Sequence, residues 1–160
     1  MSALILAPLL VGYAVADSAT LSAPVLAADH CVQAITNGGF DETVFTADGW
    51  KLDSKPMEGS LKNAKLYLKK GAGGAVLVEP AKGGGTKCSF MYFGPETSYQ
   101  VIEYQMAAHF NDRLFPLNAE TIGYKVTGHK VAVFSTHRQL SKGPMLEILV
   151  VPHDPEEKTK

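Results

Sequence analysis

Histidines and carboxylates are the side chains of this sequence that could perform acid–base chemistry near neutral pH. Among the five histidines, His137 is expected on a strand and His109 on a helix, while Glu147 is expected on a neighbouring strand. These residues are far apart in the chain, so an enzyme would have to assemble its site from separate elements. We keep a small hydrolase with this sequence-dispersed His/Glu site as the alternative interpretation. Whether the protein is an enzyme stays open, although the absence of catalytic motifs favours a protein without catalytic activity.

The residue spacings that identify common metal, nucleotide and nucleophile sites are absent. The sequence contains no H-x-x-x-H, H-E-x-x-H or C-x-x-C pattern, and no G-x-S-x-G pattern for a serine nucleophile. The glycine-rich segment 83–87 (GGGTK) lacks the order of a phosphate-binding loop, and we predict a hairpin turn there. We therefore expect neither a metal nor a cofactor.

Aromatic residues provide the one signal for a binding surface. Tyr92 and Phe93 end a predicted strand, and Phe134 and Arg138 lie on or just after another strand whose face is mixed in character. We expect a binding or accessory protein, whose partner is an envelope protein or a small apolar ligand. The net charge of -1 gives no electrostatic reason to expect a nucleic-acid partner.

The N-terminal region has the pattern of an export signal. Residues 3–16 form an apolar run of fourteen, which suits a signal-peptide core and is shorter than the about 20 residues of a membrane-spanning helix. We expect residues 1–28 to be a signal peptide and flexible leader, cleaved after Ala16 or Ala27. The mature chain would then be periplasmic or secreted, with no stable membrane span. A buried first element or a retained membrane anchor remain open, because the usual basic residues ahead of the apolar run are missing and the first Lys or Arg is Lys51.

The two cysteines, Cys31 and Cys88, fit an exported protein. An even pair in an oxidising compartment predicts a disulfide, which here would close a loop of 57 residues. Two reduced buried thiols would be the better interpretation only if the export prediction is wrong.

The rest of the chain predicts one domain over residues 29–152, followed by a disordered tail over 153–160. We expect a two-layer α+β fold: an antiparallel sheet of about six strands, one long helix packed on it, and a short N-terminal helix. Asp29 is predicted to cap the short helix, over 30–36, and the T-x-x-Q pattern at Thr97 predicts the start of the long helix.

Alternating apolar and polar residues predict the strands. Segments 64–69, 75–79 and 86–93, joined by glycine-rich turns, form an expected meander. In the last third, a two-residue turn at Gly128-His129 pairs position 124 with 133. We expect a loop over residues 138–143 to follow, and position 133 to pair with 148. This register places eight apolar residues on one face: Ile122, Tyr124, Val126, Val131, Val133, Leu146, Ile148 and Val150.

Overall fold

Alternating side chains build one antiparallel sheet, and three helices pack on one of its faces. The computed structural model describes residues 21–35, 39–82, 84–110 and 113–153. The helices are α1 (Ala23–Ala34), α2 (Thr43–Ala47) and α3 (Tyr99–His109), with short 3₁₀ turns η2 (Gly59–Leu61) and η3 (Glu96–Ser98). The strands are β1 (Lys51–Leu52), β2 (Lys65–Leu68), β3 (Gly74–Pro80), β4 (Thr86–Tyr92), β5 (Arg113–Pro116), β6 (Thr121–Lys125), β7 (Val131–Leu140) and β8 (Gly143–Pro152).

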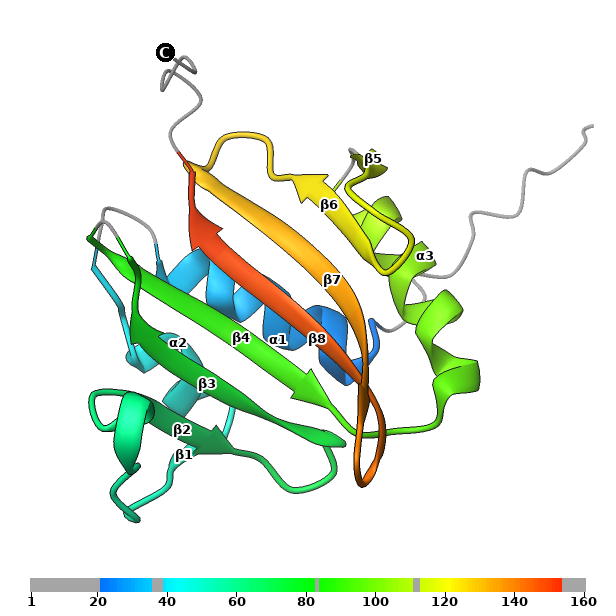
Figure 1. Ribbon diagram of the computed structural model, residues 1–160. Coiled ribbons are helices and arrows are strands. Elements are labelled where there is room, and N and C mark those ends of the chain that lie inside the picture. Colours follow the sequence, from blue (N-terminus) through cyan, green and yellow to red (C-terminus); the bar gives the residue numbers. More distant parts are fainter. Residues whose placement is uncertain (1–20, 36–38, 83, 111–112, 154–160) are drawn as a thin grey trace, which may run out of the picture.

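The sheet consists of two meanders that meet in its middle. Its strand order is β1-β2-β3-β4-β8-β7-β6-β5, and every neighbouring pair is antiparallel. Helix α3 connects the meanders along the chain, and the last strand, β8, inserts between β4 and β7 (Figure 1). The predicted α+β class with an antiparallel sheet is confirmed. The details differ: seven strands have at least four residues and β1 has two, while α1 and α3 are of similar length, with 12 and 11 residues.

The core lies between the sheet and the helices. Helix α1 crosses behind β4 and β8 in Figure 1, and no described helix lies in front of these strands. Of the eight apolar residues predicted to share one face, Ile122 is partly buried and the other seven are buried in this core. None of the helices in the described ranges is long and apolar enough to span a membrane.

Aromatic rings fill the core under the N-terminal meander. Phe45 of α2 stacks on Tyr67 of β2 at 5.5 Å between ring centroids, and it meets the edge of Trp50 at 6.1 Å. The Tyr67 hydroxyl donates a 2.8 Å hydrogen bond to Glu42. Burial, and then the Glu42 carboxylate, raise the pKa of Tyr67 well above its ordinary value, so this tyrosine is a neutral donor.

Helix α1 begins seven residues before the predicted start. Ser22 occupies the N-cap position and Pro24 lies in the first turn, where its missing N–H costs no hydrogen bond. Val25, Ala27 and Ala28 are fully buried. These small apolar residues therefore pack in the core, although the sequence predicts that they belong to a flexible leader. The predicted cap at Asp29 is therefore wrong. Residues 1–20, which include the apolar run, lie outside the described residues, as do 36–38 and most of the predicted tail, 154–160.

The start of α3 also differs from the prediction. Ser98 is the N-cap residue and the 3₁₀ turn η3 precedes it, with no side-chain capping bond. The T-x-x-Q capping box at Thr97 is thus not formed. The predicted buried face is present, with Tyr99, Ile102 and Met106 in the core.

The strand registers show how far turn chemistry determines pairing. Tyr124 pairs with Val133, as the two-residue turn predicts, whereas Val133 pairs with Val150 rather than with Ile148. The second hairpin continues to the pair Leu140 and Gly143, so its turn has two residues instead of the assumed longer loop. A shift of two residues keeps each side chain on its predicted face.

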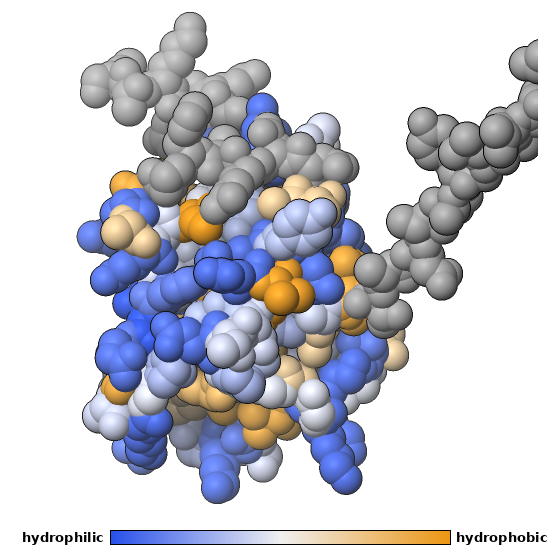
Figure 2. Space-filling view, turned by 90° about the vertical axis from the view of Figure 1, so that its right-hand side faces the viewer, coloured by the Kyte–Doolittle hydropathy of each residue, from blue (hydrophilic) through white to orange (hydrophobic). Residues whose placement is uncertain are grey.

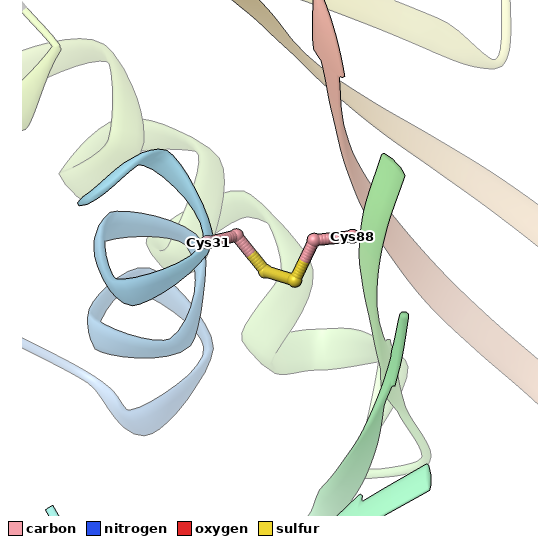
Figure 3. Close-up of a disulfide and its surroundings, with 2 residues drawn as sticks. All are labelled: Cys31 and Cys88. Atoms are coloured by element: carbon pink, nitrogen blue, oxygen red, sulfur yellow. A yellow bond between two sulfur atoms is a disulfide. The ribbon is translucent and has the colours of Figure 1, made fainter. Parts of the chain in front are cut away.

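The disulfide between Cys31 and Cys88 is present and joins α1 to β4 (Figure 3). Both residues are fully buried. The bond closes a loop of 57 residues, which contains β1, β2 and β3. In the chain-entropy model such a loop stabilises the fold by about 4 kcal/mol.

We expect the double variant Cys31→Ala/Cys88→Ala to lower the free energy of unfolding by about 2–4 kcal/mol, because its unfolded chain is less constrained. Urea unfolding followed by the fluorescence of Trp50, the one tryptophan, measures the change. Wild-type protein in reductant serves as the control and should approach the variant's midpoint. An unchanged midpoint in the variant would show that the bond contributes nothing.

Candidate functional site

A polar cluster joins α3 to β7. The Glu103 carboxylate accepts a 3.2 Å hydrogen bond from the Ser135 hydroxyl and lies 2.9 Å from Nε2 of His137. An ionised carboxylate only accepts, so Nε2 carries the proton in this pair. The Ser135 side chain is also 3.4 Å from the Tyr124 hydroxyl, and the ring of Tyr99 meets His137 edge-on at 5.2 Å.

The order of these groups suits a structural connection. Nucleophilic catalysis by serine requires the imidazole between the hydroxyl and the carboxylate, so that the imidazole can take the proton. Here Glu103 lies between Ser135 and His137, and Ser135 is fully buried. The cluster therefore fixes the helix on the sheet and satisfies a buried hydroxyl.

The other two acid–base candidates lie in separate pairs. His109 of α3 is 2.9 Å from the Asp29 carboxylate of α1. Glu147 accepts a 2.5 Å hydrogen bond from Arg138. Glu147 lies opposite Thr136 and thus on the face away from His137, since adjacent strand residues point to opposite faces. The structure does not bring His137, His109 and Glu147 together.

An apolar groove opens where β4 leaves the sheet. The last pair between β4 and β8 is Tyr92 with Leu146, while the β7–β8 hairpin continues to its turn. The chain after β4 turns away at Gly94-Pro95 into η3, where the proline offers no N–H for further pairing. The space left beside the hairpin has a volume of about 680 Å³. Its lining is Phe93, Gly94, Pro95, Leu140, Ser141, Lys142, Gly143 and Pro144.

The groove is lined mainly by apolar residues. Phe93 is 56% exposed and Leu140 is 41% exposed, so both offer apolar surface there. Its volume lies within the range of about 300–1,000 Å³ that is typical of small-molecule pockets. Figure 2 shows hydrophobic side chains among hydrophilic ones near the bottom of the molecule. The β7–β8 turn also lies at the bottom of the molecule in Figure 1, which has the same vertical axis.

One of the four predicted binding residues lines this groove. Phe93 does so directly, and Tyr92 lies beneath it, with its ring against Gly94. Phe134 pairs with Leu149 on the face away from the helices, and Arg138 is bound to Glu147 there. Leu140, Lys142 and Pro144 were not among the predicted binding residues, because the sequence predicts a loop over 138–143. No local pattern marks them as neighbours of Phe93, which lies 47 positions before Leu140.

A second, smaller cavity lies between the start of α1 and the turn after β2. Its volume is about 120 Å³, which is below the usual range of ligand pockets. Asp48 on its wall is 2.7 Å from Lys69 and 3.5 Å from His30. The hydrogen bond from Lys69, followed by the charge of His30, keeps the pKa of Asp48 below its ordinary value. Asp48 and Lys69 of this cavity are thus already paired with each other.

Comparison with known proteins gives no match: no protein family, no curated protein and no solved structure matches this chain. Within the described ranges, no group of three or more His, Cys, Asp or Glu side chains is arranged to hold a metal ion.

We expect Gly94→Ala to lower the free energy of unfolding by about 1–3 kcal/mol, because the Tyr92 side chain already fills the space beside Gly94. A Cβ atom at this position would lie 2.0 Å from the hydroxyl oxygen of Tyr92 and 2.1 Å from its Cζ. Gly39→Ala is the matched control, since no atom of the described residues lies within 4 Å of its added Cβ. Urea unfolding of both variants tests this packing, and equal midpoints would contradict it.

Proposed function

We propose that the mature chain is an exported, non-catalytic binding domain that holds a small apolar ligand in the groove beside the β7–β8 turn. The observation that supports this function is the groove itself, in which Phe93, Leu140 and Pro144 offer apolar surface around about 680 Å³. A ligand seated there would remove two exposed apolar side chains from water, which favours binding by about 25 cal/mol per Å² buried.

The shape of the site favours a small ligand over a protein partner. Stable protein interfaces bury about 800 Å² on each partner over a broad patch. The groove instead has eight lining residues from two short segments, 93–95 and 140–144. Catalysis is not part of the proposal, because the three acid–base candidates lie in separate pairs.

Export would explain why the domain relies on a disulfide, since such bonds persist in oxidising compartments. The structure of α1 also favours one of the two predicted cleavage positions. The Ser22 backbone N–H donates a 3.1 Å hydrogen bond to Gln105 of α3, and Val25 and Ala27 are fully buried. Cleavage after Ala27 would remove these contacts, whereas cleavage after Ala16 leaves all of α1 in place.

We expect the mature chain to begin at Asp17 and to contain the disulfide. Intact-mass analysis of protein from cell fractions, with and without reductant, measures both features. A mature species that begins at Ala28 would contradict the structural reason for cleavage after Ala16. A full-length species with free thiols in the cytosol would overturn export altogether.

We expect an uncharged apolar probe, 1-octanol, to bind in the groove and shift the backbone amide signals of Gly94, Leu140 and Gly143 in NMR titrations. Leu140→Ser should weaken this binding about fivefold, because it removes about 1 kcal/mol of apolar contact. Leu68→Ser is the matched control, because Leu68 is 44% exposed and Leu140 41%, and Leu68 does not line the groove.

Saturable shifts at the groove, with weaker binding in Leu140→Ser alone, would support the proposal. The absence of saturable shifts would count against it. The same would follow if both leucine variants weakened binding equally.

A further inference from the structure

The groove combines its apolar lining with one uncompensated positive charge. Lys142 lies at the second position of the β7–β8 turn and is the one charged residue among the eight that line the groove. The residue is exposed, and no carboxylate in the described ranges lies within ion-pair distance of its ammonium group. A ligand in the groove would therefore meet a cation without a partner.

The acidic residues next to the lining segments in the sequence, Glu96 and Glu147, do not line the groove, and Glu147 is bound to Arg138. Glu96 follows Pro95 of the lining and is exposed, but it does not line the groove itself. Its charge acts on Tyr99, whose pKa is raised by burial first and then by this carboxylate. Lys142 therefore determines the charge preference of the site.

The polar groups of the groove lie together at the hairpin turn. Ser141 contributes a hydroxyl next to Lys142, whereas Phe93, Pro95 and Pro144 add apolar surface. A small ligand with an apolar chain and an anionic end would match both parts. Burial of the ligand's apolar chain would supply most of the affinity, and the charge of Lys142 would determine the orientation of the ligand.

We infer that the ligand is a single-chain amphipathic anion, of the alkyl-carboxylate class, whose headgroup binds at Lys142 and whose chain lies along Phe93 and Leu140. This inference rests on the proposed binding function of the groove. It adds the chemical class and the orientation of the ligand.

The test uses NMR titrations of the full-length protein with three probes: octanoate, 1-octanol and octyltrimethylammonium. Each probe has one unbranched chain of eight carbon atoms, and the three differ in the charge of the headgroup. We expect octanoate to bind most tightly. Lys142→Met should weaken octanoate about threefold to fivefold, the size of an exposed ion pair, and change 1-octanol binding by a clearly smaller factor. Lys142→Glu should weaken octanoate further. Added salt should weaken octanoate but not 1-octanol, because it screens the charge.

Lys130→Met is the control, because Lys130 is an exposed lysine at the opposite end of β7 and should leave octanoate binding unchanged. Equal binding of octanoate and 1-octanol, with no effect of Lys142→Met, would overturn the anionic ligand class while the binding function of the groove stands. Tighter binding of octyltrimethylammonium would also overturn it. Failure of all three probes to bind would overturn the proposed function itself.

Discussion

The pairing of β4 with β8 is the contact on which the rest of the structure depends. It joins residues about sixty positions apart in the chain, such as Phe90 and Ile148, and it makes one sheet from two meanders. Helix α1 packs on both β4 and β8, so its apolar face is buried fully only when these two strands are joined. The disulfide fixes α1 to β4 at Cys88, whose partner across the strands is Val150 of β8.

The groove is a consequence of where this pairing ends. After Tyr92 the chain turns away at Gly94-Pro95, while the β7–β8 hairpin continues past this point to the pair Leu140 and Gly143. The base of the β7–β8 hairpin is therefore held in the sheet. Near its turn, residues 140–144 line the groove together with residues 93–95, which follow β4. Tyr92 belongs to both parts, because it pairs with Leu146 and its ring lies against Gly94. Packing in the core and the shape of the groove are therefore coupled through one side chain.

Local patterns predicted much of the fold and little of the candidate site. A two-residue turn determined the pairing of Tyr124 with Val133, and alternation placed the apolar faces correctly. The buried start of α1 was missed, because Pro24 and several alanines resemble a flexible segment when their contacts are unknown. The groove could not be predicted, because Phe93 and Leu140 are 47 residues apart and meet only through long-range pairing. Phe93 was identified from its type alone, without its neighbours.

Several charged side chains of the sheet and of the helix interfaces lie in pairs. On the face away from the helices, Glu79 pairs with Lys87 across neighbouring strands. Between the helices and the sheet, His–carboxylate pairs such as His137 with Glu103 occupy the acidic groups. Lys142 lies in the turn of the β7–β8 hairpin, beyond the last pair of β4 with β8, and no carboxylate in the described ranges forms an ion pair with it. A preference for an anion at the groove is therefore a property of the turn, and it can change without disturbing the sheet.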